Sequence, residues 1–166
     1  LGQEGLRSNV IGWWPSHPAE PINGVMVSNH YHKLKGPVTE NCPMPDGVVH
    51  PSELADDLAQ FRVHPAELDA NQLLPFVPKG EGIDPKKDKR LEQVAKILAD
   101  CAGVHACATA VMQNEPWDFM GVYYDAIDHF CHGFMKYHPP RQELIDEESF
   151  ELYKGVVESA YLFHDL

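Results

Sequence analysis

An apolar, aromatic run in the second half of the chain ends abruptly in carboxylate and imidazole side chains. The run, WDFMGVYYDAIDHFCHGFMKY, covers residues 117–137 and includes Asp128 and His132. These two residues are four positions apart, so in a helix their side chains share one face, with about 5–6 Å between their Cβ atoms. A carboxylate oxygen beside an imidazole nitrogen favours zinc or manganese over magnesium or calcium. We therefore predict that Asp128 and His132 are two ligands of one metal ion, with a solvated helix start as the alternative.

Other polar residues of this segment have less direct interpretations. Asp125 is predicted to cap the helix and to orient an imidazole, with a role as a further metal ligand as the alternative. His129 would project about 100° away from Asp128 on a helix, so it is less well placed for the same ion. Arg141 follows a histidine and two prolines. Its guanidinium could bind a phosphate or only cap the surface.

Residues near the start of the chain add further candidates. His30 and His32 are two positions apart, which on a strand places both side chains on one face; an exposed loop pair is the alternative. His17 follows a predicted strand and could contact a substrate there. Trp13 and Trp14 should point to opposite faces of that strand, one into the core and the other under a helix.

Two segments of the chain resemble a known family. YYDAIDHFCHGFMKYHPPR, residues 123–141, resembles the segment of the alkaline phosphatase superfamily that ends a core strand and supplies D-x-x-x-H. The likeness is to the type I phosphodiesterase and nucleotide pyrophosphatase branch. VIGWWPSHPAEPINGVMVSNHY, residues 10–31, resembles the strand and loop that follow the nucleophile helix in that branch. The resemblance implies that Asp128 and His132 bind one of two metals, and Cys131 stands where the family often has glycine.

The resemblance also implies residues that no position of this chain matches. They are an Asp on the first core strand, a Thr or Ser nucleophile, an adjacent Asp-His pair and a distant third His. We therefore predict an internal fragment of a larger metal-dependent phosphoester hydrolase, inactive alone, whose partners are the remainder of the parent chain and a small-molecule phosphoester. The intact enzyme would hold two divalent metals, zinc or possibly manganese. The alternative is a standalone, non-catalytic acidic α/β binding or interaction domain.

Composition places limits on the fold and on the partners. The chain has 166 residues, 43% of them hydrophobic, which suits one domain over 1–166 with a single core. Its 25 acidic and 13 basic residues give a net charge of −12, which argues against nucleic acid as a partner. The sequence contains no run of 18 apolar residues, so it does not predict a membrane span. The four cysteines lack C-x-x-C spacing, which favours reduced thiols and a cytoplasmic setting.

Periodicity predicts an α/β fold with a partial open, mostly parallel sheet, helices packed on it and a helical insertion. The small apolar side chains of 99–112 indicate a helix buried against the sheet, with His105 as a hydrogen-bonded core histidine. The helix and the strand after it form the αβ unit of a parallel sheet. The predicted elements are strands at 9–15, 25–27 and 117–124, a loop and helical insertion over 33–83 with helices at 53–62 and 65–74, and helices from 84, at 99–112 and over 146–166.

Overall fold

The computed structural model describes residues 1–33 and 42–165. The chain forms two compact units, and α3 (Arg90–Asn114) contributes to both of them. The first unit comprises Leu1–His64 and Asp100–Tyr124, and the second comprises Pro65–Ala99 and Asp125–Leu166. A single domain over 1–166 stays a prediction.

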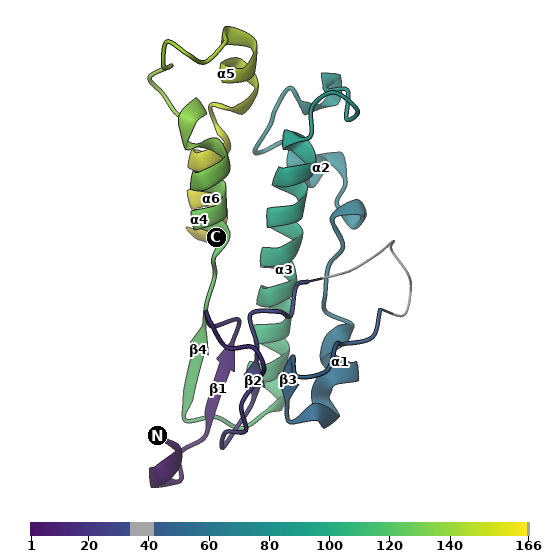
Figure 1. Cartoon of the computed structure of the whole chain (residues 1–166), viewed down its shortest axis with the longest axis vertical. Helices are drawn as coiled ribbons and strands as arrows, with labels where there is room; N and C mark the ends of the chain where they lie inside the picture. Colours follow the sequence, from purple (N-terminus) through teal and green to yellow (C-terminus); the bar gives the residue numbers. More distant parts are fainter. Residues whose placement is uncertain (34–41, 166) are drawn as a thin grey trace. The chain divides into compact units, whose positions relative to one another are not determined.

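The first unit contains a four-stranded open sheet in the order β3-β2-β1-β4 (Figure 1). β1 (Ser8–Ile11) lies between β2 (Met26–Val27) and β4 (Phe119–Val122) and is parallel to both. β3 (Val49–His50) pairs with β2 in the antiparallel direction. The predicted α/β fold with an open, mostly parallel sheet is thus confirmed. β3 was not predicted. It lies in the predicted loop and helical insertion over 33–83, of which residues 34–41 are outside the described residues.

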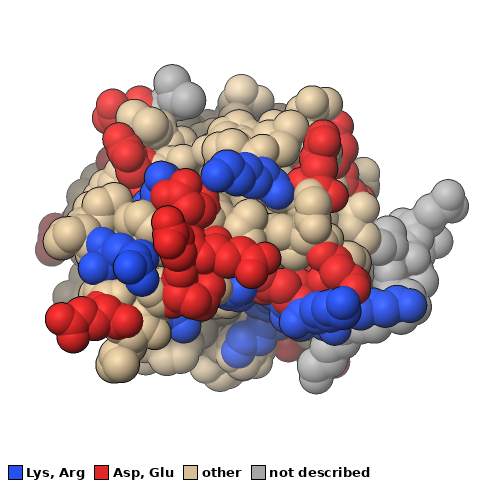
Figure 2. All heavy atoms as spheres, turned by 90° about the horizontal axis from the view of Figure 1, so that it is seen from above, with Lys and Arg blue, Asp and Glu red and all other residues tan. Residues whose placement is uncertain are grey.

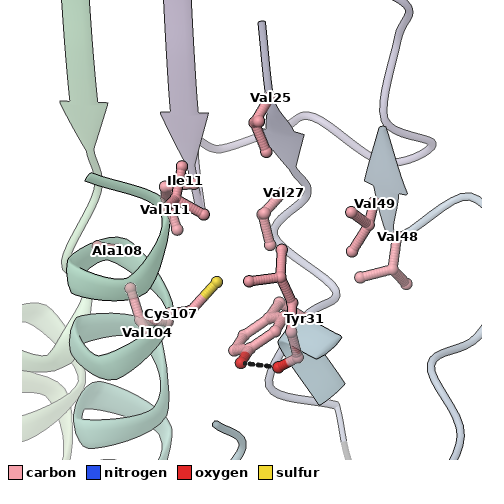
Figure 3. Close-up of a cluster of buried hydrophobic side chains, with 11 residues drawn as sticks. Ile11, Val25, Val27, Tyr31, Val48, Val49, Val104, Cys107, Ala108 and Val111 are labelled. Atoms are coloured by element: carbon pink, nitrogen blue, oxygen red, sulfur yellow. Dashed lines mark hydrogen bonds between the residues drawn. The ribbon is translucent and has the colours of Figure 1, made fainter. Parts of the chain in front are cut away.

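The hydrophobic core of the first unit lies between the sheet and the C-terminal half of α3 (Figure 3). Small side chains of α3, including Val104 and Ala108, pack against Ile11 and Val27, which confirms the predicted buried helix. Cys107 is fully buried in this cluster, and burial raises the pKa of its thiol to about 12. That thiol therefore stays protonated at neutral pH, as expected for a small core residue.

The long helix α3 differs in extent from the prediction. Its first residue is Arg90, and Asp84 instead accepts a hydrogen bond from the Lys86 backbone N–H at 2.9 Å, in a turn. Gly103 does not interrupt the helix. By length and hydropathy α3 could cross a membrane, although no apolar run of 18 residues was found in the sequence. However, 67% of its most apolar stretch of 18 residues is buried inside the structure, and helices in a protein core can have the same length and hydropathy.

The remaining helices are short. The predicted helix at 53–62 is a 3₁₀ turn followed by one α-helical turn and a half, and the predicted closing helix is divided in two at Gly155. Helices of the first unit are η1 (Gly2–Glu4), η2 (Ser52–Leu54) and α1 (Ala55–Ala59). Those of the second are η3 (Pro65–Glu67), α2 (Ala70–Leu73), η4 (Gly80–Gly82), α4 (Ala126–Phe134), η5 (Met135–Tyr137), α5 (Glu147–Tyr153) and α6 (Val156–Asp165).

Aromatic side chains form much of the interior of the second unit. Phe130 of α4 stacks on Phe76 with 5.4 Å between ring centroids, and Phe134 lies 5.6 Å from the Tyr153 ring. Phe130, Phe134 and Tyr153 are fully buried. Helices α4 and α6 pack against each other. This packing fixes which face of α4 is turned to the interior, and so which face is left for polar residues.

Asp88 gives the second unit a stability that depends on pH. Hydrogen bonds from the Arg90 side chain, above all, lower the pKa of Asp88 to about 2. Because this pKa is depressed in the folded state, the stabilisation is present above about pH 4 and is lost as the pH falls toward 2. We expect the free energy of unfolding to drop by about 2 kcal/mol more in the native chain than in Asp88→Asn between pH 5 and 2. Urea titrations of both proteins over this range measure the difference, and parallel curves would contradict it.

Candidate metal site on helix α4

Helix α4 has one apolar face and one face of possible metal ligands. Its buried residues are Ala126, Phe130 and Phe134, at intervals of four. Its polar residues follow the i, i+3, i+4, i+7 spacing that defines a single helical face. The apolar face anchors the helix in the second unit, so the polar face is held in one orientation relative to that unit. The polar face consists of Asp125, Asp128, His129 and His132.

Asp128 and His132 point toward each other across one turn of α4. The Asp128 Oδ1 atom lies 3.5 Å from His132 Nε2, and the two side chains are 67% and 80% exposed. Zinc binds carboxylate oxygen and imidazole nitrogen at about 2.0–2.1 Å, so tetrahedral geometry separates two such donors by about 3.3 Å. The observed distance therefore fits an edge of one zinc coordination shell. The expected juxtaposition is present, and metal binding itself stays a prediction.

Asp125 and His129 form a second pair of the same kind. The Asp125 Oδ2 atom lies 3.3 Å from His129 Nε2. Asp125 occupies the N-cap position of α4, yet its side chain accepts no capping hydrogen bond. The predicted capping role is therefore wrong, whereas the predicted contact with an imidazole is present. His129 thus pairs with Asp125, one turn earlier, whereas Asp128 pairs with His132.

The donor atoms supply only part of a metal site. Within residues 1–33 and 42–165, no three His, Cys, Asp or Glu side chains are grouped so that they could hold one ion. Asp128 and His132 would thus provide two ligands, and the rest of the shell would come from water or from other residues. A catalytic zinc normally has three protein ligands, so we expect two exposed ligands to bind zinc only weakly.

The histidines near the start of the chain are arranged differently from the prediction. His30 and His32 lie in a turn and share no strand face. Instead, the His30 ring stacks on His17, with 3.9 Å between centroids and 19° between planes. The His17 Nδ1 atom is 3.2 Å from Ser28 Oγ, and Ser28 is fully buried. The spacing of the histidines in the sequence did not indicate this stack. The signal that could have indicated it is the sheet topology, since both residues follow adjacent parallel strands.

Several other candidates are located by the structure. His105 is exposed rather than buried in the core, so that part of the prediction is wrong, but its Nδ1 atom lies 2.9 Å from the Tyr124 hydroxyl. Arg141 donates to the Ile145 backbone carbonyl at 2.6 Å, in keeping with its surface role. Cys131 is half-buried and is a free thiol. On the face drawn in Figure 2, Lys and Arg lie in separate groups among Asp and Glu, without one continuous basic surface.

Comparisons with known proteins add no family. No protein-family model, no curated protein and no solved structure matches this chain.

Proposed function

We propose that this chain is part of a metal-dependent phosphoester hydrolase and that Asp128 and His132 supply two ligands of one of its metal ions. The observation that supports this most directly is the 3.5 Å separation of Asp128 Oδ1 and His132 Nε2. It is close to the separation of about 3.3 Å that a tetrahedral zinc ion sets between two of its donors. The resemblance to the type I phosphodiesterase branch supplies the reaction class, a small-molecule phosphoester as substrate, and zinc or manganese as metal.

Within this proposal the residues of α4 have distinct roles. Asp128 contributes negative charge that holds the cation, and His132 contributes a neutral imidazole nitrogen. Asp125 would keep the neighbouring His129 in a fixed orientation, since its Oδ2 atom lies 3.3 Å from that ring. A bound divalent metal would activate the nucleophile and stabilise charge on the phosphoryl oxygens. The remaining ligands and the nucleophile would come from other parts of the hydrolase.

One observation favours the second candidate, a non-catalytic acidic binding domain. The Asp128–His132 pair is largely exposed and the Asp125–His129 pair is partly exposed, and each is already an ion pair when its histidine is protonated. Solvent-exposed pairs one turn apart stabilise a helix by a few tenths of a kcal/mol and require no metal. In this case the polar face of α4 would serve the solubility and stability of the helix alone.

Titration with zinc chloride by calorimetry separates the two candidates. We expect weak binding by the native chain, and at least about tenfold weaker binding by Asp128→Ala or His132→Ala, because each substitution removes a ligand. Glu158→Ala and His138→Ala are matched controls, since they remove an exposed carboxylate and an exposed imidazole elsewhere in the second unit. Equal affinity in all five proteins would remove the metal site and leave the binding domain. Circular dichroism verifies that each variant is folded.

A further inference from the structure

Four aromatic side chains are exposed where β1 and β4 end. Trp13 and Trp14 follow β1 and are 51% and 63% exposed. Tyr123 and Tyr124 follow β4 and are 38% and 39% exposed. We call these four residues the aromatic platform. All of them belong to the first unit. The prediction that one tryptophan lies in the core and the other packs under a helix is wrong, since both are largely exposed.

The platform lies at a special point of the sheet. The chain passes from β1 to β2 on one side, whereas β4 pairs with β1 on the other side. The strand order therefore reverses between β1 and β4. In open α/β sheets, ligands bind outside the carboxyl ends of the strands at such a reversal. Because Ile11 and Val122 are partners in the β1–β4 register, the residues that follow them emerge at the same sheet edge.

The backbone holds two of the four rings, those of Trp13 and Tyr123, close together. Trp13 and Tyr123 have 5.8 Å between ring centroids and 59° between ring planes. Gly12 has a φ of +73°, and a Cβ atom there would lie 3.1 Å from the Tyr123 carbonyl oxygen. Glycine thus allows the two chain segments to approach. The Tyr123 N–H donates to the Ile11 carbonyl at 2.9 Å, which extends the strand pairing as far as the platform.

We propose that the aromatic platform is a binding site for a planar heteroaromatic ring that carries no negative charge. A ring stacked on Trp13 would meet Tyr123 at a steep angle, so that one face and one edge of the ligand are both in contact. Offset stacking and edge-to-face contact are the favoured aromatic geometries. The net charge of −12 disfavours an anionic ring. The inference goes beyond the proposed hydrolase function and does not depend on a bound metal.

Adenine is a suitable probe because it is uncharged and carries neither sugar nor phosphate. Titration followed by saturation-transfer NMR should give millimolar binding to the native chain. Trp13→Ala should weaken it by at least about fivefold, which is the lower limit for loss of one base-stacking partner. Trp117→Ala is the matched control, since Trp117 is 46% exposed and precedes the opposite, amino end of β4. This control should bind adenine with unchanged affinity.

Any one of three results would overturn the proposal: absence of adenine binding, equal affinity of Trp13→Ala and Trp117→Ala for adenine, or preference for methyl glucoside, which would indicate a sugar site. Self-association of the native chain that Trp13→Ala abolishes would identify an interface between copies instead. Tyr123→Leu serves as a second variant should Trp13→Ala not fold, and it should also weaken adenine binding. All measurements are made without divalent metal, so failure of the metal site would leave their result unaffected.

Discussion

Replacing Gly24 with alanine is expected to destabilise the first unit by about 3 kcal/mol or more, because alanine adds both backbone strain and a steric clash. Gly24 has a φ of +137°, and a Cβ atom there would lie 2.2 Å from the Ser8 carbonyl oxygen. The clash is with the backbone of β1, so no side-chain rotation can relieve it. Hydrogen bonds on both sides of Gly24 also join this turn to β1: the Ser8 N–H donates to the Asn23 carbonyl, and the Val25 N–H to Asn9 Oδ1. Any shift that accommodates the methyl group therefore weakens the pairing of β1 with β2.

Urea denaturation monitored by circular dichroism measures this loss. Gly2→Ala is the matched control, since a Cβ atom at Gly2 meets nothing within 4 Å. We expect that substitution to change the free energy of unfolding by less than about 0.5 kcal/mol. Similar stabilities of the two alanine variants would show that the turn at Gly24 is not constrained as the structure indicates.

Sequence patterns predicted those parts of the fold that depend on residues close together in the sequence. The valines at 25 and 27 and the small apolar residues of 99–112 identified β2 and the buried part of α3, because their periodicity reflects burial directly. The end of β1 was placed too late. Gly12 adopts a left-handed conformation that ends the strand at Ile11, and it leaves Trp13 outside the sheet. A glycine in an apolar run does not reveal its φ angle, so the exposure of this tryptophan could not be deduced.

The beginning of α3 shows the same limit. Asp84 and Pro85 have the sequence signature of a helix start, but the helix begins at Arg90. There the Asp88 Oδ1 atom accepts a hydrogen bond from the Arg90 backbone N–H at 2.9 Å. Two aspartates close in sequence were therefore equivalent candidates. Contacts of Asp88 with residues far along the chain, such as Tyr153, distinguish them, and these contacts require the folded structure.

In the candidate sites, too, some contacts could be predicted from the sequence and others could not. The contact between Asp128 and His132 could be predicted because i and i+4 side chains meet in any helix. The stacking of His17 on His30 and the aromatic platform depend on which strands are neighbours, and residue spacing alone does not encode that. For the same reason the sequence gives no indication of a third ligand near Asp128. The pair on α4 is thus a local feature, whereas any complete metal shell would be a property of the tertiary structure.

Arg90→Met is expected to destabilise the second unit by about 3 kcal/mol, because it removes four side-chain hydrogen bonds and leaves a half-buried carboxylate without its cation. The Arg90 side chain binds both oxygens of Asp88, at 2.8 and 2.7 Å. It also donates to the Tyr137 hydroxyl at 2.8 Å and to Ser149 Oγ at 2.9 Å. Its guanidinium carbon lies 4.4 Å from the centre of the Tyr153 ring. One side chain thus joins the start of α3 to η5 and α5, and methionine retains only its apolar stem.

A double-mutant cycle separates the lost ion pair from the lost packing. If the unpaired Asp88 carboxylate is the main cost, Asp88→Asn combined with Arg90→Met should be less destabilising than the sum of the single changes, by at least about 1 kcal/mol. Arg90→Lys should be intermediate, since an ammonium keeps the charge but cannot bind both oxygens in the planar geometry of a guanidinium. Lys89→Ala is the control, because the exposed Lys89 pairs only at the surface with Glu92. Additive losses in the cycle would instead show that contacts with the tyrosine rings, rather than neutralisation of Asp88, account for the role of Arg90.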